Sequence, residues 1–140
     1  MDEYVKLFQH YSPLITPAIS IVTFIAGMFV GHWLSLGRDK RKEFNAVSDP
    51  IRMALLEQID LVNDGYFPDQ LIKKSDVNKI VAVAGVRSSR KIISAFNDYK
   101  ISADESGSND RYGKFTYKSQ YSINNLIKSM RKLINQTKRR

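Results

Sequence analysis

The sequence predicts an all-α protein, with one N-terminal transmembrane helix followed by a small cytoplasmic helical bundle of about four helices. Three observations support this fold class. A long run near the N-terminus holds no Asp, Glu, Lys or Arg. Apolar residues recur at intervals of three and four through most of the remaining chain, which is the period of a helix buried on one side. No two neighbouring segments alternate well enough to predict paired strands.

The uncharged run predicts a transmembrane helix over residues 14–37. From Pro17 to Leu36 a helix would extend about 30 Å, which matches the hydrocarbon thickness of a bilayer. Thr16 can cap its start, and proline at the first helical position lacks only an N–H that has no partner there. A cleaved signal peptide has a basic start and a shorter apolar core, whereas acidic residues open this chain. The other alternative is a buried core helix, which the small polar remainder could not surround.

Basic residues on one side of the run predict its orientation. They follow it directly: Arg38, Lys40, Arg41 and Lys42. The lead before the run, residues 1–13, has only Lys6. The positive-inside rule therefore predicts a single-pass membrane protein with a short extracytoplasmic lead and a cytoplasmic C-terminus. The four residues also lie at headgroup level, where anionic lipid attracts them, although setting the topology alone would explain them.

Small residues recur every four positions within the run: Thr23, Gly27, Gly31 and Ser35. This spacing places them on one helix face, where small side chains let two helix backbones approach closely. The functional interpretation is that the helix associates with itself or with another membrane protein. The alternative is chance, because glycine is common in membrane helices.

A short stretch after the run resembles a known group of proteins. Residues 37–45, GRDKRKEFN, followed by DPIR at 49–52, resemble the juxtamembrane part of short uncharacterised bacterial single-span membrane proteins. The resemblance implies a bacterial source, and therefore the bacterial inner (plasma) membrane, with the same topology. It implies no activity. Residues 38–48 predict a basic helical extension of the membrane helix. Ser48 or Asp49 can cap a new helix and Pro50 suits its first turn, so we expect the cytoplasmic helical domain to occupy residues 49–140.

Three helices are predicted in the first part of this domain. An apolar stripe over residues 50–63 predicts the first, with Ile51, Leu55, Ile59 and Val62 in line and Leu56 beside them. Ser75 can cap a second helix, although residues 80–86 are β-branched enough to form a strand instead. A third stripe predicts a helix over residues 87–101. It comprises Ile92, Ala95, Phe96 and Tyr99.

The end of the chain combines a loop with the clearest amphipathic pattern. Residues 103–110 are small, polar and acidic, which is typical of a loop. Ser119 can cap a final helix, and its apolar residues recur at helical spacing: Ile123, Leu126, Ile127, Met130, Leu133 and Ile134. Residues 111–140 hold nine basic side chains and no acidic one, whereas the net charge of the whole chain is +8. The basic excess therefore belongs to this last segment.

The basic tail is a candidate contact surface for lipid or nucleic acid. Its cations and aromatic rings alternate: Arg111, Tyr112, Lys114, Phe115, Tyr117 and Lys118, with Lys128, Arg131 and Lys132 on the final helix. Such a pattern can stack on and neutralise a single-stranded nucleic acid. It also suits a segment that lies on a bilayer. The third interpretation is that the rings pack against the bundle and the cations face solvent.

The sequence predicts a protein that acts by binding, not an enzyme. There is no cysteine, no Gly-rich phosphate loop and no metal-ligand spacing, so we expect no catalytic residues, cofactor or metal. The expected partners are membrane lipid and a second copy or another membrane protein. The expected role is a membrane-tethered adaptor or effector, a type of protein found in phage exclusion and defence. The alternatives are a tethered nucleic-acid binder that uses the basic tail and, third, a small enzyme.

Overall fold

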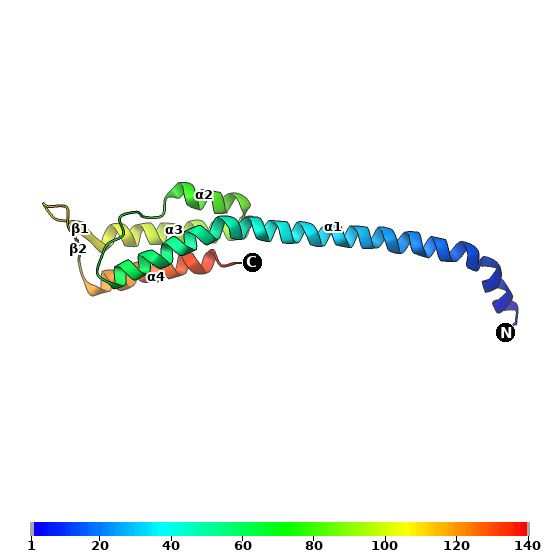
Figure 1. The fold of residues 1–140 in the computed structure, drawn as a ribbon. Helices are drawn as coiled ribbons and strands as arrows, with labels where there is room; N and C mark the ends of the chain where they lie inside the picture. The colour runs from blue at the N-terminus through cyan, green and yellow to red at the C-terminus, as the bar shows by residue number, and fades with distance from the viewer. Residues whose placement is uncertain (1, 140) are drawn as a thin grey trace. The chain divides into compact units, whose positions relative to one another are not determined.

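The computed structural model describes the backbone of residues 2–139 and the side chains of Pro13 and residues 17–139. In this part of the chain the elements follow the order α1 (Asp2–Asn63), α2 (Lys74–Val83), α3 (Val86–Ser106), β1 (Gly107–Asn109), β2 (Phe115–Tyr117) and α4 (Gln120–Gln136) (Figure 1). The protein is therefore helical with very little strand, and one long apolar helix lies at the N-terminus, as predicted. The side chains of residues 1–12 of the predicted lead and of Thr16 lie outside the described residues.

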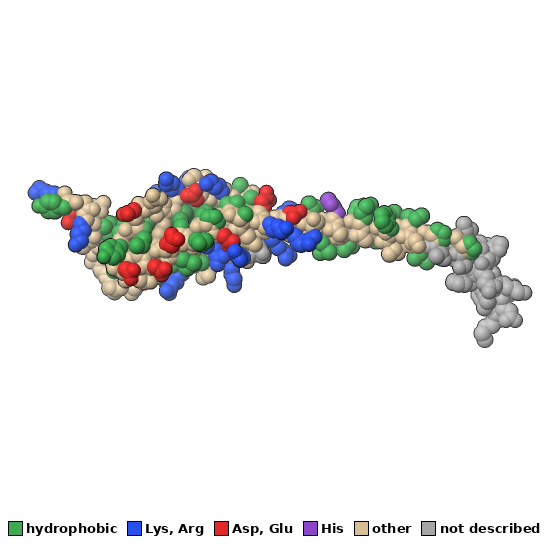
Figure 2. Space-filling view, viewed as in Figure 1, with side chains coloured by type: hydrophobic (Ala, Val, Ile, Leu, Met, Phe, Trp, Pro, Cys, Tyr) green, Lys and Arg blue, Asp and Glu red, His purple; other side chains and the backbone are tan. Residues whose placement is uncertain are grey.

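The chain divides into two units, Met1–Asp39 and Lys40–Arg140, and α1 contributes to both. In the first unit the apolar side chains of α1 are exposed, as the green surface in Figure 2 shows. By length and composition α1 is apolar enough to cross a membrane, with a mean hydropathy of 1.8 in its most apolar window. The helix begins at Asp2, so the prediction of a start at Pro17 was wrong. A proline inside a helix removes one hydrogen bond, and the neighbouring turns carry the helix past it.

The predicted helix break at residues 48–50 was also wrong, because α1 continues to Asn63. Ser48 is fully buried, and its hydroxyl donates to the carbonyl oxygen of Asn45 instead of capping a new helix. Burial on one face explains the continuity. Phe44 lies before Pro50 and Ile51 after it, and both are buried in the same core. A break between them would move one of these side chains out of the core.

All four described helices contribute to the hydrophobic core of the second unit. Its buried apolar residues are Phe44, Ile51, Leu55, Ile59, Val62, Val77, Ile80, Ile92, Ala95, Phe96, Tyr99, Ala103, Leu126, Met130 and Leu133. Partly buried residues pack around them, including Val81, Ala84, Ile123, Ile127 and Ile134. The predicted apolar stripes are thus confirmed, except that Leu56 on α1 is half exposed.

Residues 80–86 suited either a helix or a strand by sequence, and the structure shows helix over residues 80–83. α2 covers Lys74–Val83, and extended backbone at Ala84 and Gly85 separates it from α3. The predicted cap was wrong, because Lys73 occupies the N-cap position and makes no side-chain capping bond. Ser75 lies inside the helix.

The predicted loop at residues 103–110 was wrong, because the end of α3 and the first strand of a β-hairpin occupy most of it. α3 extends to Ser106, and β1 then pairs antiparallel with β2, Gly107 opposite Tyr117 and Asn109 opposite Phe115. Gly113 has a φ of 79° in the connecting turn, a conformation that favours glycine. The ring of Phe115 stacks on Phe67 at 3.9 Å between centroids. A partner far away in the sequence therefore holds the hairpin.

The final helix forms as predicted. Ser119 is its N-cap, and its hydroxyl accepts a hydrogen bond of 3.2 Å from the backbone N–H of Ser122. Leu126, Met130 and Leu133 are fully buried. The apolar face of α4 therefore closes the core.

Candidate functional site

The apolar part of α1 in the first unit has no cover within the described structure. Phe24, Phe29 and Trp33 expose 70%, 71% and 77% of their surface. A contiguous apolar surface of this size is unusual on a water-soluble protein and marks a site of contact with lipid or with another protein. The run is therefore the first candidate surface.

The predicted small-residue face lies open on this helix. The hydroxyl of Thr23 donates to the carbonyl oxygen of Ile19 at 2.8 Å, so its polar donor is satisfied within the helix. A Cβ atom added to Gly27 or Gly31 would meet nothing within 4 Å in the structure. Ser35 follows on the same helix. The glycines therefore leave room beside the backbone that no described residue of this chain fills.

The four cations that follow the apolar run belong to two units. Arg38 belongs to the first unit, and Lys40, Arg41 and Lys42 belong to the second. All four are exposed. Among the described residues, none of them forms an ion pair. Their charges are therefore available to a ligand or to solvent.

The hairpin separates the aromatic residues of the basic tail into two groups. Phe115 and Tyr117 are partly buried against Phe67, and the Tyr117 hydroxyl donates to the carbonyl oxygen of Tyr66 at 2.9 Å. Burial raises the pKa of Tyr117. Arg111, Tyr112 and Lys114 are exposed near the turn, and Tyr112 exposes 91% of its surface. Packing of the rings against the helical core was one of the three predicted alternatives.

The turn that carries Tyr112 is organised by Asp110. Its carboxylate accepts hydrogen bonds from the backbone N–H groups of Tyr112 at 2.8 Å and Lys114 at 2.9 Å. Lys118 follows β2, and its backbone N–H donates to the carbonyl oxygen of Ser106. The tip therefore presents one free ring and two cations on a defined turn.

The basic residues of α4 have different environments. Lys128 and Arg131 are exposed and line a shallow groove of about 370 Å³ with Asn63, Asn124 and Ile127. Lys132 pairs with Asp98 of α3, so part of its charge is used within the protein. The structure does not gather these three cations and the hairpin tip into one continuous site.

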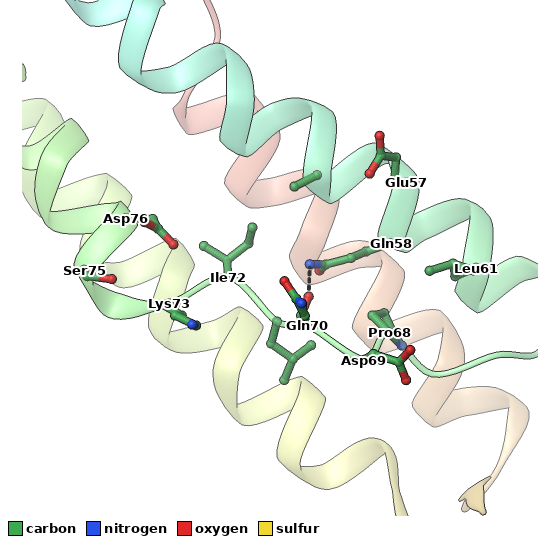
Figure 3. A pocket seen from close by; sticks show the side chains of 12 residues that line it. Glu57, Gln58, Leu61, Pro68, Asp69, Gln70, Ile72, Lys73, Ser75 and Asp76 are labelled. Atoms are coloured by element: carbon green, nitrogen blue, oxygen red, sulfur yellow. Dashed lines mark hydrogen bonds between the residues drawn. The ribbon is translucent and has the colours of Figure 1, made fainter.

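A groove that sequence reasoning missed lies between α1 and residues 68–76, and Figure 3 shows its lining. It has a volume of about 660 Å³, and its charged residues are Glu57, Asp69, Lys73 and Asp76. At its wall the Gln58 side-chain amide donates to the carbonyl oxygen of Gln70 at 2.8 Å.

The polar groups behind this groove form a closed network. The Tyr99 hydroxyl donates to the Gln58 side-chain oxygen at 2.8 Å and accepts from the backbone N–H of Ile72 at 3.2 Å. Burial raises the pKa of Tyr99 to about 12, against the opposing effect of these two hydrogen bonds. The network holds the segment before α2 on the core. The only sign of this network in the sequence is Gln58, a polar residue within the apolar stripe of α1.

Two further observations limit the chemistry of the described residues. No group of three or more His, Asp or Glu side chains among them could hold a metal ion. The Asp49 carboxylate pairs with Arg139 and Arg52. The hydrogen bond from Arg139 lowers the pKa of Asp49. This pair, which joins residues 90 positions apart, was not predicted.

Comparisons with known proteins give no family for the chain. No protein-family model, curated protein or solved structure matches it.

Proposed function

We propose that this protein is a single-pass component of a bacterial inner membrane that acts by binding. The observation that carries the proposal is the exposure of the apolar side chains between Ile19 and Leu36. In water these side chains would present a large contiguous apolar surface. In a bilayer the same helix length matches the hydrocarbon core, and the exposure is favourable.

The charge distribution supports an orientation with the second unit in the cytoplasm. Arg38, Lys40, Arg41 and Lys42 are exposed directly after the apolar run, where basic residues mark the cytoplasmic side. Residues 1–13 would then lie outside. The resemblance of residues 37–45 to short bacterial single-span proteins agrees with this topology.

The mode of action we propose is association through the membrane helix together with recognition by the second unit. The uncovered face of Thr23, Gly27, Gly31 and Ser35 fits a second copy or another membrane helix. Such a protein would be a tethered adaptor, or an effector whose oligomerisation perturbs the membrane, as in phage exclusion or defence. Neither role requires catalysis or a cofactor.

The packing of the hairpin makes a nucleic-acid binder the less favoured alternative. Stacking on bases requires exposed rings, and Phe115 and Tyr117 are packed against Phe67. Tyr112 is the ring that remains exposed at the tip. A small enzyme is the third candidate, and no described constellation of side chains favours it.

The proposed topology is tested by reporter fusions to the full chain. Alkaline phosphatase, which is active only in the periplasm, is fused after the last residue and is expected to be silent. Changing the cations at 38, 40, 41 and 42 to glutamine should raise its activity, because the charge bias within reach of the membrane is lost. The matched control changes Lys73, Lys74, Lys79 and Arg87 to glutamine and should leave the fusion silent. High activity of the unmodified fusion would reverse the topology.

A further inference from the structure

Basic side chains from three separate segments gather at the end of the second unit where α1 enters it. They come from α1, from the start of α3 and from the residues after α4: Lys40, Arg41, Lys42, Arg87, Arg90, Lys138 and Arg139. We call this surface the basic end. We propose that it binds the anionic headgroups of a lipid bilayer. The proposal rests on the proposed function, because it requires the apolar run to span that bilayer.

The first two segments are joined by a groove. A hollow of about 580 Å³ is lined by Lys40, Arg41 and Glu43 of α1 and by residues 82–85, directly before α3. Arg87 and Arg90 lie in the first turns of α3 and are exposed. Val86, at the start of the same helix, exposes 72% of its surface. The helix start therefore presents cations beside an uncovered apolar side chain.

The third segment is held in place by Asp49. The Arg139 guanidinium donates from Nε to both carboxylate oxygens at 3.1 Å and from Nη2 to Oδ2 at 2.7 Å. Thr137 is fully buried, and its hydroxyl donates to the carbonyl oxygen of Leu133 at 3.0 Å. Figure 1 shows the end of α4 beside the part of α1 that belongs to this unit. Lys138 therefore lies near the cations of α1 although the sequence separates them widely.

Acidic side chains do not neutralise the basic end. Within residues 39–52, 82–91 and 133–139 the acidic residues are Asp39, Glu43 and Asp49, and Asp49 is already paired. No carboxylate of the described structure pairs with the cations at 40–42, 87, 90 or 138. Figure 2 shows Lys and Arg side chains gathered at this end. The surface therefore keeps a net positive charge.

Acidic residues gather toward the opposite end of the unit, beside the hairpin. The hydroxyl of Tyr117 in β2 donates there to the carbonyl oxygen of Tyr66, which follows α1. The acidic residues near this bond are Asp60, Asp64, Asp104 and Glu105, and the cations of the hairpin are Arg111, Lys114 and Lys118. At the basic end cations outnumber the acids, whereas near the hairpin they do not, so an anionic surface attracts the unit more strongly by its basic end.

The chain length keeps the basic end close to a bilayer spanned by the apolar run. Lys40 follows Leu36 by four residues, so a fully extended connection separates them by at most about 14 Å. Electrostatic attraction decays over about 8 Å at physiological salt. The maximum separation of about 14 Å is less than two of these decay lengths, so part of the attraction still acts on Lys40. We therefore favour lipid headgroups, which the membrane helix keeps nearby, over an anionic partner that would have to reach the basic end by diffusion.

The experiment uses the full chain in vesicles and a fluorophore at one introduced cysteine. The sequence has no cysteine, so Val86→Cys gives a single labelled position. Vesicles contain phosphatidylcholine alone or with phosphatidylglycerol, and each also carries a lipid with a quencher on its headgroup. We expect stronger quenching with phosphatidylglycerol, and loss of this difference at high salt. Equal quenching in both vesicles would overturn the proposal.

Charge variants identify the surface responsible. Arg87→Gln with Lys138→Gln should reduce the quenching that depends on anionic lipid, because two of the cations of the basic end are lost. The matched control, Arg111→Gln with Lys114→Gln, removes the same charge at the hairpin tip and should leave it unchanged. Equal loss in both would assign the effect to net charge and overturn the proposal.

Two further measurements separate the possible causes of failure. Thermal unfolding shows whether each variant is folded. If alkaline carbonate extracts the chain from the vesicles, the proposed function fails and this inference fails with it. A chain that resists extraction but shows no lipid-dependent quenching contradicts the basic end alone.

Discussion

At the scale of single residues, the Tyr99 hydroxyl joins α1, α3 and the segment before α2. It bonds to Gln58 and to the backbone of Ile72, and Gln58 bonds in turn to Gln70. Each of these groups would otherwise be a polar atom turned toward the core, where an unpaired donor or acceptor is costly. The network therefore supports both the core and the wall of the groove in Figure 3.

We predict that Tyr99→Phe lowers the stability of the folded chain by about 1–3 kcal/mol, because it leaves two polar partners unsatisfied. The midpoint of thermal unfolding, followed by circular dichroism of the full chain in detergent, should fall by several degrees. Tyr121→Phe is the control, since Tyr121 is 74% exposed and should tolerate the change. Equal midpoints for the two variants would mean that the network contributes nothing.

The same phenol predicts a loss of stability at alkaline pH. Burial raises the pKa of Tyr99 to about 12 in the folded protein, whereas a tyrosine in an unfolded chain titrates near pH 10. Between pH 10 and 12 the unfolded chain has lost a proton that the folded chain keeps. The free energy of unfolding therefore falls with pH, by up to about 1.4 kcal/mol per pH unit. In Tyr99→Phe this decline should be shallower than in Tyr121→Phe, which the pH dependence of the unfolding midpoint measures.

At the scale of elements, Pro50 distinguishes the sequence-based expectation from the structure. Next to Ser48 and Asp49 it is typical of a helix start, yet it lies inside α1. The proline removes the hydrogen bond to the carbonyl oxygen of Ala46 and costs about 3 kcal/mol. Burial of Phe44 and Ile51 on either side offsets this cost. Local sequence shows the proline, whereas the compensating contacts appear only in the folded core.

We predict that Pro50→Ala stabilises the chain by about 1–3 kcal/mol, because it restores a helical hydrogen bond at an exposed position. The unfolding midpoint should rise by several degrees. Met53→Ala, at another exposed position of α1, should change it little. If the helix broke before Pro50, the proline would be in a favoured position, and its replacement would leave the midpoint unchanged or lower it.

Elements whose stabilising contacts are local could be predicted, and those held by distant partners could not. The stripes of α3 and α4 identify their own buried faces. The stripe of α3 continues through Ala103 and Ser106, both buried, but the neighbouring acids and glycine gave this stretch the composition of a loop. The hairpin depends on Phe67, about fifty residues earlier in the chain, and no local pattern indicates that contact.

The same difference between local and distant contacts decides which candidate surfaces the sequence could predict. The apolar run and its flanking cations are continuous in sequence, so the sequence alone identifies them. Within the basic tail, successive side chains of β2 point to opposite faces. Phe115 and Tyr117 share the face that contacts Phe67, whereas Tyr112 lies in the turn and is exposed. The bond between Asp49 and Arg139 joins opposite ends of the second unit's sequence. A basic surface assembled from such segments becomes visible only when the fold brings them together.

At the scale of the whole molecule, the small-residue face is a candidate surface for contact with a second chain. A glycine that is needed for internal packing has atoms close to the place of its missing Cβ, but Gly27 and Gly31 have none within 4 Å. Isoleucine is also a better helix former than glycine, so it should not weaken α1 itself. An effect of Gly→Ile on the behaviour of the protein would therefore arise from contacts with another chain.

We predict that Gly27→Ile and Gly31→Ile each weaken self-association of the full chain in vesicles by about tenfold or more, which corresponds to about 1.4 kcal/mol. The added side chain holds two helix backbones apart and removes their close contact. Association is measured by energy transfer between donor- and acceptor-labelled chains as lipid dilutes the protein. Phe29→Ala is the control, because Phe29 lies about half a turn away from the two glycines and is exposed. Equal association of all three variants would exclude the glycine face as the interface. A wild-type chain that shows no energy transfer at any dilution would exclude self-association, and the face would then be left to a different membrane helix.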